Sequence, residues 1–262
     1  MIRSHQSHLP TKNPSTNDRM PEQLTLYTAK ICPFAQRAEL ALEEAKAEYT
    51  RFEIDLQNKP EWYAPKVNPA SKVPAVAYGG PKVAPDQPSP DSEKIAESLV
   101  LLEFIADLYP NSTLLPKDPV DRAKVRFFID AISTKFAPGY IGAVLRGESF
   151  DTLFQGIEGI QSLLGKGDFA VGNSFTNADA AALPFIARTL VALEHDLGAF
   201  PAGSGSQAFK TLQEDPKYAR FRAYYQTLAS RESFKKTFNE ELIKDVYGKR
   251  FTALRAEKQG GK

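Results

Sequence analysis

The chain is poor in the residues that build disulfide frameworks and metal sites. Its 262 residues include one cysteine and three histidines. A single thiol, Cys32, excludes an intramolecular disulfide and is typical of a reducing compartment. The histidines (His5, His8 and His195) are scattered, and the sequence has no Cys/His ligand spacing. We therefore expect no metal site, and any thiol chemistry must depend on Cys32.

The chain also lacks an excess of either charge and any long apolar run. Its 33 basic residues balance 32 acidic ones, without a clustered basic patch, so nucleic acid and anionic membranes are not expected partners. No apolar stretch approaches the ~20 residues that span a bilayer. Residues 1–21 are polar and have no apolar core for a secretory signal. We expect them to form a disordered leader on a cytoplasmic protein, with a transit peptide as a weaker alternative.

The first third of the chain has alternating strand and helix patterns. Residues 22–29 (EQLTLYTA) and 50–56 (TRFEIDL) alternate apolar and polar positions, which predicts strands. Between them, residues 34–49 have strong helix composition, and Pro33 stands where proline is favoured, at the first helical position. This order predicts a right-handed βαβ unit with parallel strands. Residues 73–80 and 93–96 predict two more strands.

No alternating segment follows Val120, where the sequence is helical in period or polar. The length also exceeds the ~100–200 residues of a common single domain. We therefore predict an α/β domain followed by an all-helical domain. The predicted parts are a leader at 1–21, the α/β domain at 22–111, a proline-containing linker at 112–116 and the helical domain at 117–262.

The chemistry expected of Cys32 follows from its place at the start of a helix. Helix N-termini carry roughly half a positive charge and free N–H donors, which favours a thiolate. Arg37, one turn later, can add positive potential. The alternative is a small buried apolar residue, as many free cysteines are. Ala35 stands where a dithiol motif has its second cysteine, so a disulfide on Cys32 must be resolved by an external thiol. In the cytosol the abundant external thiol is glutathione.

Two further segments have features of a peptide-binding site. A cis bond before Pro74 would present the N–H and C=O groups of Val73 to an extended ligand, although an ordinary trans proline is the alternative. Glu97 and Ser98 open a predicted helix. Ser98 is either a plain N-cap or a hydroxyl directed at a ligand carboxylate, with Glu97 meeting an ammonium group.

At these residues the chain resembles the cytosolic glutathione transferases, the omega class in particular, over residues 22–247. CPFAQR at 32–37 is similar to the omega active-site motif, and residues 58–76 (NKPEWYAPKVNPASKVPAV) are similar to the segment with the class's second helix and cis-proline. The resemblance implies a thioredoxin-like first domain, glutathione as co-substrate and a homodimer. The loop 79–92 is longer and richer in proline than usual in this family, and its effect on the dimer surface or pocket rim is an open question.

The resemblance also implies residue roles. Cys32 would form the mixed disulfide with glutathione, beside Phe34. Lys59 would pair with the glycine carboxylate, while Val73, with Pro74 in cis, would bind the cysteinyl backbone.

Further roles follow from the same resemblance. Glu97 and Ser98 would hold the γ-glutamyl end of glutathione. Thr176 and Asp179 would form a helical capping box that serves stability. Arg188 would face the second-substrate pocket, with a solvent-facing side chain as the alternative.

The second-substrate pocket is expected between the domains. The aromatic segments 125–136 and 218–226 predict its walls, with Phe127, Phe128, Phe136 and Tyr224 as candidates beside Arg188. The alternative is that these aromatic residues are mostly core.

Three functions fit the sequence. The first is a glutathione-dependent thiol transferase or reductase, which includes thioltransferase, dehydroascorbate reductase and deglutathionylation activities. The second is a non-catalytic carrier, or ligandin, of hydrophobic aromatic compounds in the interdomain cleft. The third is a chloride-intracellular-channel-like protein, which the charged first helix disfavours because it contains Glu39, Glu43, Glu44 and Lys46.

Overall fold

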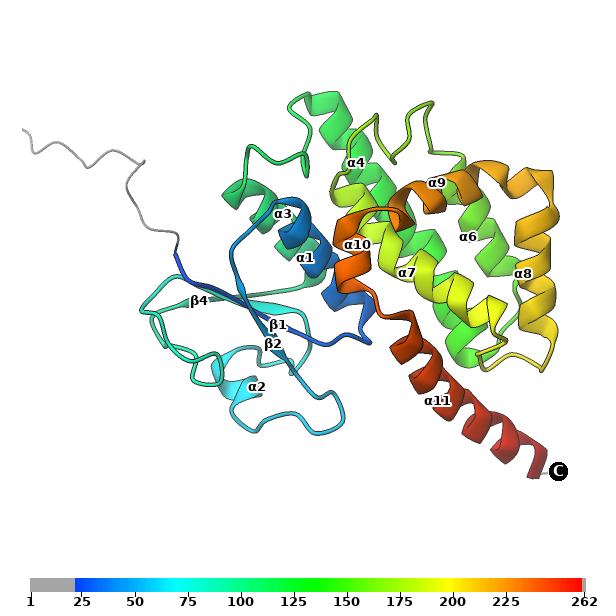
Figure 1. Ribbon diagram of the computed structural model, residues 1–262, viewed down its shortest axis with the longest axis horizontal. Coiled ribbons are helices and arrows are strands. Elements are labelled where there is room, and N and C mark those ends of the chain that lie inside the picture. The colour runs from blue at the N-terminus through cyan, green and yellow to red at the C-terminus, as the bar shows by residue number, and fades with distance from the viewer. Residues whose placement is uncertain (1–21, 261–262) are drawn as a thin grey trace, which may run out of the picture.

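The computed structural model describes residues 22–260, so the predicted leader lies outside the described residues. Figure 1 shows a small sheet with its helices on one side of the molecule and a larger group of helices on the other. The first part of the chain forms β1 (Leu24–Thr28), α1 (Pro33–Glu44), β2 (Thr50–Glu53), α2 (Tyr63–Lys66), β3 (Ala75–Tyr78), β4 (Glu93–Ala96) and α3 (Ser98–Leu108).

The sheet has four strands in the order β2-β1-β3-β4. β1 and β2 are parallel, whereas β3 is antiparallel to both β1 and β4. The parallel pair around α1 confirms the predicted βαβ unit. This mixed sheet with its helices is the thioredoxin-like fold.

The rest of the described chain contains no strand and is helical. Its elements are α4 (Pro119–Ala131), a π-helical turn (Ile132–Phe136), α5 (Ala137–Tyr140), a second π-helical turn (Ile141–Arg146), α6 (Asp151–Gln161), α7 (Asn177–Glu194), α8 (Ser204–Glu214), a 3₁₀ turn (Pro216–Tyr218), α9 (Ala219–Ala229), α10 (Glu232–Thr237) and α11 (Glu240–Gly260). The predicted helices are present. The sequence pattern does not predict α8, because the polar, glycine-containing start of this helix resembles a loop.

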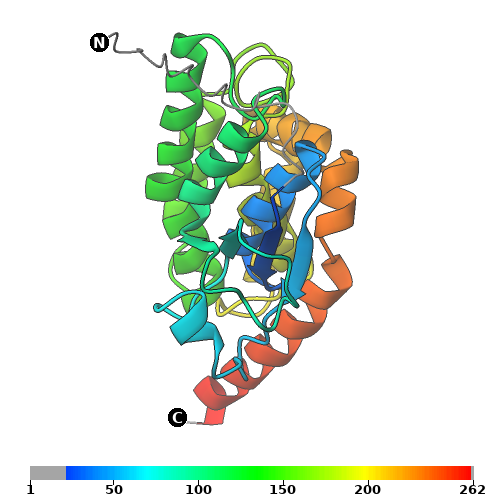
Figure 2. The same ribbon diagram turned by 90° about the vertical axis from the view of Figure 1, so that its left-hand side faces the viewer.

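The two faces of the sheet pack against different partners. Leu24, Leu26 and Val76 join a large core with α1, α3 and the helical domain. Tyr27 points to the opposite face and packs there with Tyr63 of α2. Figures 1 and 2 show α1 and α3 between the sheet and the helical domain. The helical domain therefore reaches the sheet through α1 and α3.

The long loop at residues 79–92 folds over the α2 face of the sheet. The Tyr27 hydroxyl donates to the carbonyl oxygen of Pro85 at 2.8 Å, and the Gln23 side chain bonds both backbone groups of Val83 at 3.0 and 3.2 Å. None of this loop lines the cavity that contains Cys32. The loop extends the cover of the sheet, not the rim of that cavity.

α7 runs through the centre of the helical domain, and every residue from Asn177 to Leu193 is buried. Its N-terminus has the predicted capping box, since the Asp179 carboxylate accepts from the Thr176 N–H at 2.8 Å. In residues 22–260 no helix is both long and apolar enough to cross a membrane. The predicted domain boundaries at 111 and 117 stay predictions, and they fall between α3 and α4.

Candidate active site

Cys32 is the N-cap residue of α1. It has extended backbone dihedrals (φ −81°, ψ 118°), and Pro33 begins the helix as predicted. The Cys32 N–H donates to the Ala29 carbonyl at 2.9 Å, and its C=O accepts from Gln36 at 3.2 Å. The chain therefore turns from β1 into α1 with the half-buried thiol at the junction.

A cavity of about 390 Å³ surrounds the thiol. It brings together all seven residues that the sequence predicts for catalysis and glutathione binding, and adds four others, Leu56, Asn68, Ser71 and Lys72. The seven are Cys32, Phe34, Lys59, Val73, Pro74, Glu97 and Ser98. They come from three separate segments, namely the start of α1, residues 56–74 and the start of α3. The volume lies within the ~300–1,000 Å³ range of small-molecule sites.

The segment before β3 is fixed beside the thiol. The Val73–Pro74 bond is cis, and the Cys32 Sγ–H donates to the Val73 carbonyl oxygen at 3.9 Å. The Tyr63 hydroxyl and the Asn68 amide both donate to the Lys72 carbonyl, at 2.7 and 2.8 Å. Val73 therefore presents backbone groups next to the sulfur, as an extended thiol peptide requires.

The start of α3 faces the same cavity. Glu97, not Ser98, is the N-cap residue, and its φ of 70° is in the left-handed region that non-glycine residues rarely adopt. Such strained residues are concentrated at binding sites. Glu97 is exposed, and the Ser98 hydroxyl accepts from the Arg37 Nη1 at 3.3 Å. Lys59 donates to the Ser71 carbonyl at 2.6 Å, which leaves two ammonium protons for a ligand.

The electrostatic environment of Cys32 corrects one expectation. Burial raises the pKa of the Cys32 thiol, whereas the sequence predicts a lowered value. The N–H groups of Ala35 and Phe34, followed by the guanidinium groups of Arg188 and Arg37, act in the opposite direction and lower this pKa. The helix N-terminus thus has the predicted effect, but the cost of desolvating a thiolate is larger.

Comparison with known proteins identifies the family. The family "Glutathione S-transferase, N-terminal domain" matches residues 31–108. A rice protein described as "Probable glutathione S-transferase DHAR1, cytosolic" is 32% identical over 206 residues, which cover 79% of this chain and 83% of that protein. Glutathione transferase Omega 1C from Trametes versicolor is 57% identical and superposes with a TM-score of 0.86 over 89% of this chain and 98% of that one. The chain belongs to the omega-class glutathione transferases.

A second fungal structure adds a bound compound. Glutathione transferase Omega 2S from Trametes versicolor, crystallised with 2,4-dihydroxybenzophenone, is 42% identical, with a TM-score of 0.82 over 86% of this chain and 97% of that one. Glutathione transferase omega-1 of mouse is 27% identical over 66% of this chain and 69% of that protein. Membership of this class makes the chain a glutathione-dependent thiol transferase, with glutathione as its co-substrate.

The enzyme buries the cation Arg37 close to the thiol. Arg37 is 2% exposed, donates from Nε to the Ala181 carbonyl at 3.0 Å and lies over the Phe185 ring at 4.6 Å. Its burial lowers its pKa to about 10, which leaves it a cation at neutral pH. Arg37 therefore connects α1 to α7 and holds a positive charge beneath the cavity.

The aromatic residues predicted for the second-substrate pocket lie elsewhere. Phe128, Phe136 and Tyr224 are at most 1% exposed and belong to the core of the helical domain, which corrects the prediction that they wall the pocket between the domains. They lie on the buried faces of α4, the first π-helical turn and α9, respectively. Phe127 is 61% exposed, and together with Phe128 it lines a separate cavity of about 650 Å³ between α4 and residues 163–172.

Arg188 also differs from its predicted position. The side chain is completely buried and bonds the residues that precede Cys32, so it is not solvent-facing and does not line the cavities around the thiol. The sequence could not indicate this, because an arginine in an apolar helix has the same pattern whether it faces a pocket or a backbone turn.

A cavity of about 970 Å³ lies between the two domains, where the sequence predicts the second-substrate pocket, but none of the residues predicted for that pocket lines it. α11 forms one wall with Leu242 and Val246, and the ends of β1 and β2 form the other with Ile31 and Leu56. Leu56 also lines the Cys32 cavity, so the two cavities adjoin. The sequence signal for the α11 wall is the spacing of Leu242, Val246 and Lys249, which places the three residues on one face of a helix.

Proposed function

We propose that the enzyme transfers glutathionyl groups through a mixed disulfide on Cys32. The observation that carries this proposal is the cavity in which the thiol at the N-cap of α1 meets the Val73 backbone, Lys59, Glu97 and Ser98. These groups fit the tripeptide, since they offer a cation for one carboxylate, a hydroxyl and helix N–H donors for the other, and a carboxylate for the ammonium. Glutathione would thereby place its sulfur near the Cys32 sulfur.

The reaction consists of two balanced exchanges. The Cys32 thiolate attacks the glutathione sulfur of a glutathionyl disulfide, forms the Cys32–glutathione disulfide and releases the partner as a thiolate. A second glutathione thiolate then attacks the glutathione sulfur of this disulfide, which releases oxidised glutathione and restores the Cys32 thiolate. Because Cys32 is the only cysteine, the second exchange needs an external thiol.

The interdomain cavity is the proposed second-substrate site. Its walls combine apolar residues such as Ile31 and Val246 with charged residues of both signs, namely Lys30, Lys249 and Arg250 and the acids Glu53, Asp55 and Asp245. This combination favours compounds with a flat apolar body and a polar group. Ketones conjugated to glutathione fit this description. Dehydroascorbate is small and polar and does not need the apolar walls, but it is a candidate substrate in line with the DHAR name of the rice relative.

We also propose a homodimer, a cytoplasmic location and a domain linker at residues 112–116. The exposed apolar side chains on α3 and α4 support the dimer, and the cytosolic rice relative supports the location.

Intact-mass measurement tests the mechanism. After incubation with oxidised glutathione, the wild-type protein is expected to gain one glutathionyl group that a reductant removes, while Cys32→Ser gains none. Turnover of a glutathionyl disulfide should fall at least a thousandfold in Cys32→Ser, because serine cannot replace the nucleophile. An unmodified wild-type protein would contradict the proposal.

Ligand carriage is a second candidate function. It is favoured by the benzophenone complex of the 42% identical Omega 2S protein and by the apolar cavity beside Phe127. Displacement of a fluorescent apolar dye from wild type and Phe127→Ala tests it. Carriage at this cavity requires weaker dye binding in Phe127→Ala, and equal binding would exclude this cavity.

A further inference from the structure

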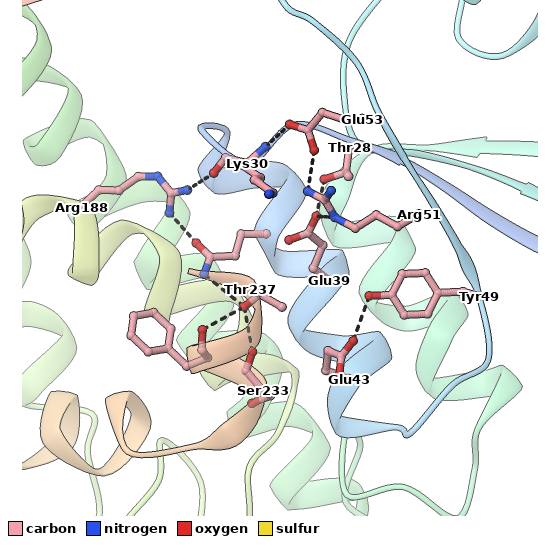
Figure 3. Close-up of polar contacts among 12 residues, drawn as sticks. Thr28, Lys30, Glu39, Glu43, Tyr49, Arg51, Glu53, Arg188, Ser233 and Thr237 are labelled. Atoms are coloured by element: carbon pink, nitrogen blue, oxygen red, sulfur yellow. Dashed lines mark hydrogen bonds and ion pairs between the residues drawn. The ribbon is translucent and has the colours of Figure 1, made fainter. Parts of the chain in front are cut away.

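Arg188 bonds the two residues that directly precede the active-site cysteine. From α7, its Nη2 donates to the Lys30 carbonyl at 3.0 Å and its Nε donates to the Ile31 carbonyl at 3.1 Å. Figure 3 shows the guanidinium reaching from the helical domain to the turn at Lys30. The side chain is 0% exposed, so the contact is part of the interior of the enzyme.

The same guanidinium also bonds the residue one turn after the thiol. Arg188 Nη1 donates to the Gln36 amide oxygen at 2.5 Å, and Gln36 donates onward to the Thr237 hydroxyl of α10 at 3.3 Å. One planar group therefore holds the chain on both sides of Cys32. Lysine has a single nitrogen and cannot reproduce these divergent bonds.

The opposite side of the Lys30 peptide is fixed by a chain of charged residues. The Lys30 N–H donates to the Glu53 carboxylate at 2.7 Å, and Arg51 pairs with Glu53 at 2.6 Å. Arg51 also pairs with the buried Glu39 of α1 at 2.9 Å. Figure 3 shows this chain continuing through Lys30 to Arg188. The turn that carries the thiol is held from both domains.

The charge of Arg188 is not neutralised by a nearby carboxylate. Within residues 22–260 its four hydrogen bonds go to three backbone carbonyls and one amide, and it makes no ion pair. Burial of an unpaired guanidinium is costly, and an apolar residue would fill this place on α7 more favourably if packing were the only requirement. A functional reason for this burial cost is that the Arg188 charge acts on a neighbouring anion, the Cys32 thiolate.

Few other charges face Cys32. The cations are Arg37 on α1 with Lys59 and Lys72 in the segment before β3, the acid is the exposed Glu97, and the phenols are Tyr63 on α2 and Tyr247 on α11. Arg188 and Arg37 are the two buried cations in this set. Burial strengthens their effect on the sulfur relative to the exposed groups, which solvent screens.

We propose that Arg188 is a positioning residue for the Cys32 reaction, which fixes the turn at residues 30–32 and supplies a buried positive charge that favours the thiolate. The proposal rests on the role of Cys32 described above. In this proposal the guanidinium hydrogen bonds position the turn, and the guanidinium charge favours ionisation of the Cys32 thiol. The effects of these two parts can be separated by substitution.

Arg188→Met and Arg188→Lys separate charge from geometry. Iodoacetamide is neutral, so nearby charges do not attract it, and Cys32 is the only thiol in the protein. The rate at which iodoacetamide alkylates Cys32 at each pH therefore reports the fraction of thiolate alone. Arg188→Met is expected to move the midpoint of this profile upward and to slow alkylation at pH 7 roughly threefold to tenfold. Arg188→Lys keeps the charge and should leave the midpoint near that of wild type, but it should lower kcat for a glutathionyl disulfide because the fork is lost.

The alkylation midpoint and kcat together distinguish the proposed role of Arg188 from a purely structural role and from failure of the Cys32 mechanism. A lower Tm in Arg188→Met with an unchanged alkylation midpoint would overturn the electrostatic part, and an unchanged kcat in Arg188→Lys would overturn the positioning part. Alkylation does not involve glutathione, so it tests Arg188 even if wild type forms no mixed disulfide. If Arg188→Met does not fold, Glu53→Ala tests the clamp from the other side, because it removes the acceptor of the Lys30 N–H. Glu53→Ala should lower kcat without moving the midpoint, and equal kcat would overturn the clamp.

Discussion

The Cys32 sulfur lies 3.9 Å from the carbonyl oxygen of Val73, although the two residues are 41 positions apart in the chain. This contact brings the start of α1 against the turn before β3, and with it the two segments that enclose the proposed glutathione site. Burial raises the pKa of Cys32, which favours the protonated thiol, the form that can donate to this carbonyl oxygen. Ionisation of the sulfur breaks this bond and leaves the thiolate facing the N–H groups of α1.

The pH dependence of Cys32 alkylation follows from this environment. Burial raises the pKa of the folded thiol, so the midpoint of the iodoacetamide rate is expected above the ~8.5 of an unperturbed cysteine. The rate should rise about tenfold per pH unit below the midpoint, because only the thiolate reacts. The raised pKa also makes stability depend on pH. The protonated thiol contributes to the unfolding free energy below pH ~8.5, the unfolded-state value, and this contribution is lost as pH rises through the folded-state pKa.

The same protein unfolded in urea is the control, and its midpoint should return to about 8.5. A folded-state midpoint below 8 would show that the α1 N-terminus and the two arginines outweigh burial.

Ala35→Cys tests the argument that the enzyme depends on an external thiol. Position 35 is buried one turn into α1, where a second cysteine creates the spacing of a dithiol motif. The new thiol should displace glutathione from the Cys32 mixed disulfide and form an internal disulfide. Intact mass after treatment with oxidised glutathione should then show loss of two hydrogens in place of the adduct. Ala35→Ser adds similar bulk without a thiol and should retain the adduct.

The sequence predicted the parts of the fold that depend on local pattern. Alternation predicted β1 and β2, the short segments 73–80 and 93–96 predicted β3 and β4, and Pro33 marked the start of α1. Site residues were found where a residue type has a distinct chemical use, as with Cys32, the pair Glu97–Ser98, and Pro74. The structure brings these residues into one cavity.

What the sequence could not supply depends on packing between distant elements. The direction of the Cys32 pKa shift is set by how deeply the sulfur lies between the domains, and a helix N-terminus alone predicts the opposite sign. Phe128 and Tyr224 have the same helical period whether they face a pocket or the core. Arg188 bonds residues that lie 157 and 158 positions before it, a relation that no local pattern reports.

A bidentate ion pair joins the end of α1 to the helical domain. Arg231 donates from Nε and Nη2 to the two carboxylate oxygens of Glu44, each at 2.6 Å, and lies over the Phe169 and Phe175 rings. Arg231→Ala should lower the unfolding free energy by about 2–4 kcal/mol, because it leaves the nearly buried Glu44 without its cationic partner and with only the Ser233 hydroxyl as donor. Urea unfolding provides the measurement. Lys236→Ala, which breaks the more exposed pair with Glu43, is the matched control and should cost at most ~1 kcal/mol.

The capping box of α7 is expected to be a main determinant of stability. The Asp179 carboxylate accepts from the Ala170 N–H, the Thr176 N–H and hydroxyl, and the Tyr224 hydroxyl, at 2.8 to 3.0 Å. Burial raises its pKa to about 6, so it is ionised at pH 7, as four donors require. Asp179→Asn turns an NH₂ group toward these donors and should cost about 3–5 kcal/mol at pH 7.

Tyr224→Phe, which removes one of the four donors, should cost only about 1–2 kcal/mol. Both values are read from thermal or urea unfolding at pH 7. Equal costs for the two variants would mean that Asp179 is not the centre of the network.

The proposed dimer is expected to use α3 and α4. Five large apolar side chains are exposed in the described chain, and two of them, Phe34 and Leu56, line the Cys32 cavity. The other three are Val100 on α3 with Val120 and Phe127 on α4, the last two of which also line the cavity of about 650 Å³. An ion pair between Glu103 and Arg126 connects these two helices at 2.8 Å.

A charge placed among these apolar side chains should oppose association, because it would have to be desolvated in the interface. Val100→Glu combined with Phe127→Asp is therefore expected to give a monomer by light scattering at concentrations where wild type is a dimer. Lys210→Ala on α8 changes an exposed residue outside this face and should leave the dimer intact. The Cys32 alkylation rate separates loss of the dimer from loss of the fold, since it should stay within about twofold of wild type in the monomer.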